Sequence, residues 1–296
     1  MRPIRLHTLA VGTLTAALLV APPAGAAETD NTAASSAASS AATSTVAQDP
    51  SDDLVLNPAQ PDFTLVNLPT GLRLARFKSA FRVTHRFGRP LGQGSFGSLV
   101  EDFFGFDAGA RIGLEYRFGL WDGLQAGIYR TSDRTIEFFT QYNVVRQQDT
   151  FPVALDVYLT AEGTNNFKDS YSPGVSAVIS RTIGEHAAVY AMPAWVNNTN
   201  DLPSEVVDDN STFLLGFGTR LRIRPTVYVV GEFVPRVAGY DPGDHLLTFA
   251  IEKRLGGHAF QLNFSNSTGS TLAQVARSFA NSDDWFIGFN ISRKFY

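Results

Sequence analysis

From residue 79 to the end, the chain repeats one pattern: large apolar side chains at every second position, with small or polar side chains between them. The last copy is the clearest, since Trp285, Ile287, Phe289 and Ile291 share one parity. A period of two belongs to a β-strand with one apolar and one polar face. About twelve such segments occur, each bounded by turn residues. We expect strands at 79–88, 108–119, 122–131, 134–146, 151–162, 173–183, 186–197, 211–224, 226–236, 245–255, 258–266 and 284–296.

The connections between these segments alternate in length. Short turns fall at 119–121, 147–150, 184–185, 225 and 256–257, and long loops at 89–107, 163–172, 198–210, 237–244 and 267–283. Only 132–133 is short where a long loop is due. Outer-membrane barrels show this asymmetry, with short turns on the periplasmic side, whereas a soluble sandwich has no reason for it. The sequence therefore predicts an all-β, transmembrane, antiparallel up-and-down barrel of about 12 strands, with both termini periplasmic.

The chain before the barrel divides into three parts. Residues 1–26 have a charged start, an apolar middle and the small-residue site Ala24-Gly25-Ala26, which together predict a secretory signal peptide. Residues 27–61 are rich in Ala, Ser and Thr, so we expect a disordered linker. Residues 62–78 are expected to form a short amphipathic helix, a periplasmic approach segment or a plug inside the lumen. The barrel itself is expected to span 79–296.

Charged residues within the predicted strands share the polar parity. An Arg or Lys facing lipid near the bilayer midplane costs roughly 2–4 kcal/mol, so these charges belong inside the barrel. The lumen-facing candidates are Arg111, Glu115, Arg117, Glu137, Asp156, Arg220, Arg222, Arg224, Glu232, Glu252 and Arg254.

Two interpretations of this charged set stay open. The charges can pair in a closed lumen, because an unpaired buried charge is costly. Alternatively, they can line a narrow aqueous path, since twelve strands lie between barrels that side chains fill and barrels that leave a channel. Arg220, Arg222 and Arg224 recur at every second position, and inward basic residues outnumber acidic ones by parity. We therefore expect a wet, positive wall that admits anions.

The sequence predicts no catalytic, cofactor-binding or metal-binding residues. His85 has outward parity and no Ser two residues away, and the acidic loop 201–210 lacks a regular ligand spacing. The chain has no cysteine, and its net charge of −4 gives no reason to expect a nucleic-acid partner. The expected partners are outer-membrane lipid and the barrel-insertion machinery, with aromatic Phe295 and Tyr296 as a C-terminal assembly signal.

Several motifs resemble a bacterial membrane-bound, outer-membrane β-barrel family of unknown function. They are THRF at 84–87, GSFG at 94–97, EDFFG at 101–105, IGLEYRFG at 112–119, QAG and YRT at 125–131, and EGTNNF at 162–167. The resemblance spans most of the chain after residue 61. It implies the barrel and no activity.

The expected function is therefore that of a non-enzymatic barrel in the outer membrane of a Gram-negative-type bacterium, forming a narrow pore for small, anionic solutes. Two alternatives remain. One is a plugged structural or adhesive barrel without transport, and the other is a barrel enzyme that acts on lipid.

Overall fold

A computed structural model describes residues 57–105, 109–148, 150–200, 210–277 and 280–295. All of them belong to one compact unit, Ala47–Tyr296. The predicted signal peptide, most of the predicted linker and nearly all of the acidic loop lie outside the described residues. Tyr296 does too, whereas Phe295 ends the last strand with its side chain on the outer face. The C-terminal assembly signal thus stays a prediction.

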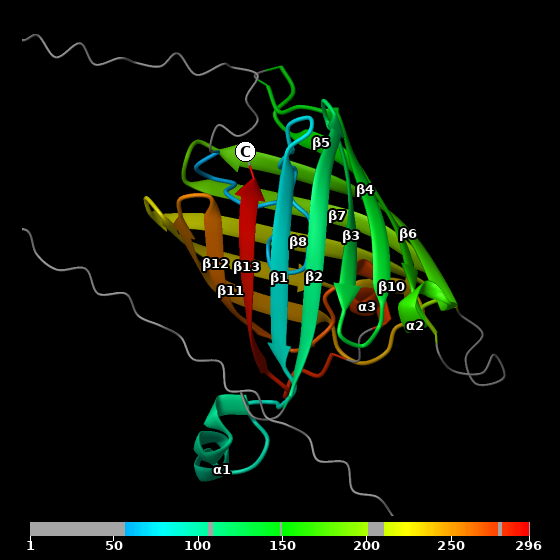
Figure 1. Ribbon diagram of the computed structural model, residues 1–296, viewed down its shortest axis with the longest axis vertical. Helices are drawn as coiled ribbons and strands as arrows, with labels where there is room; N and C mark the ends of the chain where they lie inside the picture. The colour runs from blue at the N-terminus through cyan, green and yellow to red at the C-terminus, as the bar shows by residue number, and fades with distance from the viewer. Residues whose placement is uncertain (1–56, 106–108, 149, 201–209, 278–279, 296) are drawn as a thin grey trace, which may run out of the picture. The chain divides into compact units, whose positions relative to one another are not determined.

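Within the described residues, thirteen strands form one antiparallel sheet that closes on itself. Their bounds are β1 (Ser79–Phe87), β2 (Ala110–Trp121), β3 (Leu124–Thr131), β4 (Ile136–Val145), β5 (Ala154–Gly163), β6 (Asp169–Ile183), β7 (Ala187–Asn197), β8 (Ser211–Arg224), β9 (Val227–Val234), β10 (Arg236–Gly239), β11 (Leu246–Leu255), β12 (His258–Ser265) and β13 (Phe286–Phe295). β9 and β10 both pair with β8 and together occupy one position, so thirteen minus one leaves twelve positions in the ring. The predicted twelve-strand barrel is confirmed (Figure 1).

The first and last strands meet and close the ring. β1 pairs with β2 on one side and with β13 on the other, and Ser79 lies opposite Phe295. The start of β1 and the end of β13 therefore lie at the same end of the barrel, which is also the end of the short turns. We call the two ends the short-turn end and the long-loop end.

Most strand bounds lie within three residues of the predicted ones, and the two larger departures each have a backbone reason. β6 begins at Asp169, four residues before the expected 173, because Ser172 and Tyr171 continue the ladder opposite Glu162 and Gly163. The ninth predicted strand is divided at Pro235, which has no N–H to donate to a ladder. The register with β8 shifts just after this point, between Arg236 and Ala238.

The outer face of the ring is apolar, and its side chains remain exposed. Ile251 is 56% exposed, Phe249 48% and Leu262 47%, and every strand from β2 to β12 carries at least one exposed large apolar residue. An apolar surface that encircles a protein is far too large to be left in water. It matches the hydrocarbon core of a membrane.

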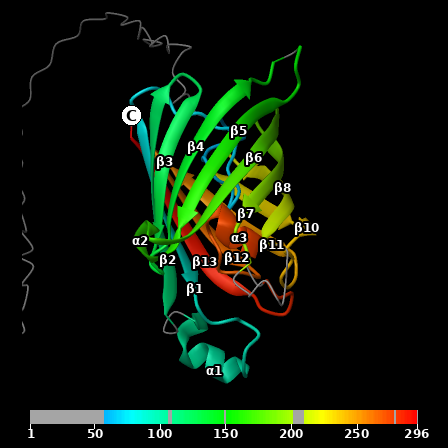
Figure 2. The same cartoon turned by 90° about the vertical axis from the view of Figure 1, so that its right-hand side faces the viewer.

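Short helices occur only in connections, as far as the described residues go. α1 (Phe96–Glu101), capped by the Ser95 hydroxyl, and the 3-10 turn η1 (Phe103–Gly105) lie beyond the long-loop end (Figure 1). α2 (Thr164–Phe167) joins β5 to β6, whereas α3 (Leu272–Arg277) turns back inside the ring (Figure 2). None of these helices is long and apolar enough to cross a membrane.

A charge on the outer face should destabilise the barrel according to its depth. Ile251 and Leu255 of β11 are almost equally exposed, at 56% and 54%, but Ile251 lies at mid-strand and Leu255 at the strand end. We expect Ile251→Arg to lower the free energy of unfolding in lipid vesicles by roughly 2–4 kcal/mol and Leu255→Arg by at most about 1 kcal/mol. Equal losses in a denaturant titration would contradict a membrane-embedded outer face.

Candidate functional site

The predicted lumen residues separate into two groups. Seven are buried on the inner face, none more than 5% exposed: Glu115, Arg117, Glu137, Asp156, Arg220, Glu232 and Glu252. The other four, Arg111, Arg222, Arg224 and Arg254, are at least partly exposed near strand ends. Side chains alternate between inward and outward along the whole length of a strand. Only those near the middle of the strand, however, are enclosed by the ring.

The lumen is occupied by residues 57–75, which we call the plug (Figure 1). The plug contains no helix, and its centre is a tight hairpin in which Leu65 N–H donates to Leu68 O at 2.8 Å and Thr70 N–H to Phe63 O at 2.8 Å. The apolar side chains of the plug are buried: Phe63, Leu65, Val66, Leu68, Leu72 and Leu74. Leu65, Val66 and Leu68 pack in one cluster with inward residues of the wall such as Tyr190 and Leu214.

Glu232 on β9 holds the tip of the plug hairpin. Its Oε1 accepts the backbone N–H groups of Val66, Asn67 and Leu68 at 2.7, 2.8 and 2.9 Å. Its Oε2 accepts the Asn67 side-chain amide at 3.1 Å. Three adjacent N–H groups aimed at one oxygen form an anion cradle, and Glu232 is the anion. The wall therefore satisfies backbone groups that the hairpin leaves unpaired.

Two buried arginines bridge the wall and the plug. Arg220 donates to Thr64 O at 2.8 Å and to Glu252 at 2.9 Å. Arg82 donates to Val66 O at 3.3 Å and to Glu115 at 2.6 Å. Each guanidinium thus has its charge neutralised by a wall carboxylate and also donates to a plug carbonyl. Further donors to plug carbonyls are the amides of Gln125, Gln141, Gln261 and Asn290.

The predicted wet, positive wall of Arg220, Arg222 and Arg224 is wrong. Arg220 is 0% exposed and paired, Arg222 binds Glu185 at the short-turn rim at 3.1 Å, and Arg224 is exposed at the end of β8. Counting charged residues by their parity along the strand overlooked how far each residue lies from the ends of the barrel. It also overlooked the plug, whose carbonyl oxygens are partners for the surplus donors.

A second element closes the long-loop end. The residues of α3 from Leu272 to Ala276 are buried, and Leu272 N–H donates to Glu137 at 3.1 Å. Thr271 and Arg277 both contact the carboxylate of Glu162 on β5. The loop-length pattern predicts 267–283 to be a long loop, and the structure places α3 of this segment inside the ring. The apolar residues Leu272, Val275 and Ala276, spaced as on one face of a helix, were the available signal.

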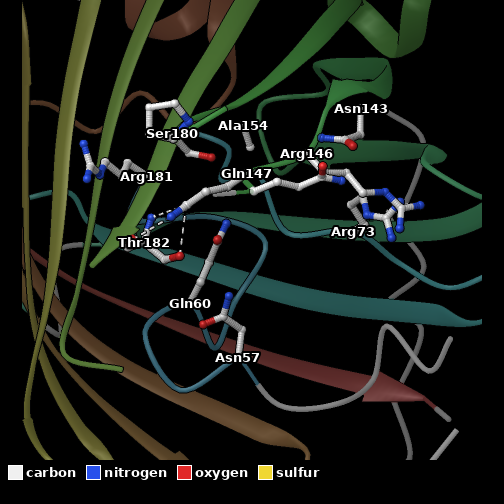
Figure 3. A pocket seen from close by; sticks show the side chains of 13 residues that line it. Asn57, Gln60, Arg73, Asn143, Arg146, Gln147, Ala154, Ser180, Arg181 and Thr182 are labelled. Atoms are coloured by element: carbon white, nitrogen blue, oxygen red, sulfur yellow. Dashed lines mark hydrogen bonds between the residues drawn. The ribbon is translucent and has the colours of Figure 1, made fainter. Parts of the chain in front are cut away.

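The free space in the lumen is divided into two vestibules. The short-turn vestibule, drawn in Figure 3, has a volume of ≈510 Å³ and is lined by plug and wall residues. The long-loop vestibule has ≈420 Å³ and lies beside α3. Between them, around the tip of the plug and Glu115, the cavity measures ≈20 Å³. That is room for about one water molecule.

The described residues give little support to a catalytic site. His85 faces outward and stacks on Phe289, with ring centroids 4.7 Å apart. Its Nδ1 has no hydrogen-bond partner in the part of the chain that the structure describes. A nucleophilic serine needs a base within hydrogen-bond reach. No cluster of three or more metal-ligating side chains occurs among the described residues either.

Loss of the Glu232 carboxylate should loosen the plug. Glu232→Ala leaves three buried N–H groups unpaired, at about 1–3 kcal/mol for an unsatisfied group. With Leu68→Cys as the reporter in this cysteine-free chain, thiol labelling should be faster by about tenfold or more. Glu185→Ala, which removes an exposed carboxylate at the rim, is the matched control and should leave the rate unchanged. Equal labelling in all backgrounds would contradict the role of Glu232.

Solved structures similar to this chain are outer-membrane proteins with little sequence identity. The NanC porin has 7% identity and a TM-score of 0.48 over 74% of this chain and 99% of that one. The KdgM porin in complex with disordered oligogalacturonate has 7% identity and a TM-score of 0.46 over the same shares. The Acinetobacter baumannii outer membrane protein Omp33 has 10% identity and a TM-score of 0.40 over 75% of this chain and 100% of that one.

Sequence comparison gives a clearer result. No curated protein sequence matches the chain. One family model, described as a membrane bound beta barrel domain (DUF5777), matches residues 62–295. The match covers the ring of strands and most of the plug. The chain therefore belongs to this family of membrane-bound β-barrels.

Proposed function

We propose that the protein is a channel for small polar solutes in a bacterial outer membrane, and that residues 57–75 keep it closed at rest. The observation that carries this proposal is the way in which the plug is held. Side chains of the wall bind its backbone, but its one β-bridge, Thr64 to Pro69, is internal. The plug can therefore leave the lumen without breaking any strand pairing of the ring.

The two vestibules support a path along the lumen. They have volumes of ≈510 and ≈420 Å³ and occupy the two ends of the barrel. Without the plug, the inner wall would present the acids Glu115, Glu232 and Glu252 beside the bases Arg82 and Arg220. This mixture favours small polar solutes and gives no reason for the anion preference expected from the sequence.

The proposal includes the cellular location of the barrel and its orientation in the membrane. Membership of a membrane-bound barrel family, the apolar outer face and the predicted signal peptide all favour the outer membrane. Short turns lie on the periplasmic side of such barrels, so we propose that the plug enters from the periplasm. We also propose that the barrel has no catalytic activity, a proposal supported by His85, which stacks on Phe289 in the outer face.

A static, plugged barrel is the second candidate function. The plug has a buried apolar cluster and many hydrogen bonds to the wall, and α3 adds a further closure at the long-loop end. A barrel of this kind would never conduct. Conductance measurements therefore separate the two candidates.

An engineered disulfide should lock the channel. A Cβ built on Gly71 of the plug lies 3.5 Å from the Cβ of Ser180 on β6, within the range of roughly 3.5–4.5 Å found in disulfides. In planar bilayers we expect wild-type protein to show brief openings, and oxidised Gly71→Cys/Ser180→Cys to show none. Reduction should restore the openings, and the single variant Ser180→Cys should behave like wild type with or without reductant.

Two results would contradict the proposed function. If the oxidised pair opens as often as the reduced pair, the solute path does not require movement of the plug. If neither wild type nor Glu232→Ala ever conducts, the barrel is static, and the second candidate stands.

A further inference from the structure

A groove crosses three neighbouring strands on the outer face of the ring. β11, β12 and β13 lie side by side (Figure 1), and the groove between their side chains has a volume of ≈540 Å³. Gln261 and Asn290 border it, but their side chains bond each other on the inner face at 2.8 Å. The outward residues that line it are Ile251, Lys253, Phe260, Leu262, Phe289 and Ile291. Five of these six are apolar, so this outer groove offers contacts mainly to hydrocarbon.

Basic side chains gather at the short-turn end of the outer groove. Lys253 lies opposite Phe260, and one row nearer the short turns His258 lies opposite Arg293. Cross-strand partners have Cβ atoms roughly 5 Å apart, and diagonal neighbours such as Lys253 and His258 are about 7–8 Å apart. The three side chains can therefore reach one small group. By parity, the outward-facing charged residues of β11, β12 and β13 are Lys253 and Arg293, and both are positive.

These basic groups have no acidic partner in the part of the chain that the structure describes. The Arg293 guanidinium lies over the Phe295 ring, 5.3 Å from its centroid, and the His258 ring stacks on Phe260 at 5.9 Å. Such contacts orient the basic groups and leave their N–H donors available to a ligand. The buried arginines of the lumen differ, since wall carboxylates neutralise Arg82 and Arg220.

The basic residues lie at the depth of the membrane interface. Arg293 is two residues from the end of β13, Lys253 is two residues from the end of β11, and His258 begins β12. A basic residue costs little at this depth, and its long side chain can extend toward the phosphates of the lipid. From there the outer groove runs toward the middle of the strands, where hydrocarbon chains lie.

We propose that the outer groove binds one anionic phospholipid, with an acyl chain against its apolar residues and the phosphate held by Lys253, Arg293 and His258. The membrane supplies this occupant, because the chain belongs to a family of membrane-bound barrels. Two positive charges without acidic partners then favour a lipid of net negative charge over a zwitterionic one. The site lies wholly on the outer face, so binding does not depend on movement of the plug.

The test places a fluorescent reporter beside the outer groove. Val229 of β9 is 39% exposed and lies opposite Ile251, but it does not line the groove. Val229→Cys, labelled with bimane, is reconstituted in phosphatidylcholine vesicles that contain a small fraction of brominated phosphatidylglycerol or brominated phosphatidylcholine. Fluorescence quenching gives the binding of each lipid near the reporter. A second reporter, Val157→Cys on β5, lies on the opposite side of the ring from β12.

We expect phosphatidylglycerol to bind at the Val229→Cys reporter about tenfold or more tightly than phosphatidylcholine, and the two lipids to bind equally at the Val157→Cys reporter. Lys253→Gln and Arg293→Gln should each lower this preference about fivefold, the effect of one basic residue near an anionic surface. Lys253→Arg should retain it. Arg181→Gln is the matched control, because Arg181 is an exposed arginine at the short-turn end of β6, away from the groove.

Several results would overturn the proposal. Equal binding of the two lipids at Val229→Cys would exclude the headgroup site. An equal preference at both reporters, or an equal loss in Arg181→Gln and Lys253→Gln, would show a general attraction of the surface for anions. If neither lipid quenches the Val229→Cys reporter, a second copy of the chain covers the groove. A failure of the channel proposal would appear in conductance and would leave these quenching ratios unchanged.

Discussion

The polar backbone of the plug is the constraint on which the interior depends. An irregular segment inside a narrow lumen cannot rely on water or on a strand partner for its N–H and C=O groups. The wall supplies them instead, with Glu232 as acceptor for three N–H groups and Arg220 and Arg82 as donors to carbonyls. Wall carboxylates then neutralise these arginines, so this part of the charged inner face holds the plug as a set.

The ring of strands could be predicted closely from the sequence, because a strand buried on one side and bathed in lipid on the other must alternate. Alternation and turn residues located β1, β8 and β12 almost to the residue. The errors in the predicted strand bounds occur where backbone hydrogen bonding, and not the side-chain pattern, determines where a strand begins or ends. Pro235 divides a strand whose apolar alternation continues across it, and the start of β6 depends on ladder pairs opposite β5.

The interior was predicted only in part. Parity identified Glu115, Arg117 and Arg220 as inward residues, because charge is excluded from the lipid face. Parity could not predict the hydrogen-bond partners of these residues. The plug contributes mostly backbone oxygens, and because every residue has one, the sequence gives no sign of which oxygens act as partners. The inward turn of α3 was missed for a related reason. A loop that returns into a lumen has the same composition as one that stays in solvent until its buried partners, such as Glu137, are known.

The closing seam between β1 and β13 has a consequence for how the barrel assembles. Val66 O accepts from Arg82 of β1 at 3.3 Å and from Asn290 of β13 at 3.1 Å, while Arg86 of β1 donates to Asn67 at 3.2 Å. A single hairpin tip therefore joins the first and last strands of the ring from within. Residues 57–75 are synthesised before any strand and can act as an internal template on which the final strand docks. The attachment of the plug and the strength of the seam are thus energetically linked, since the same hydrogen bonds contribute to both.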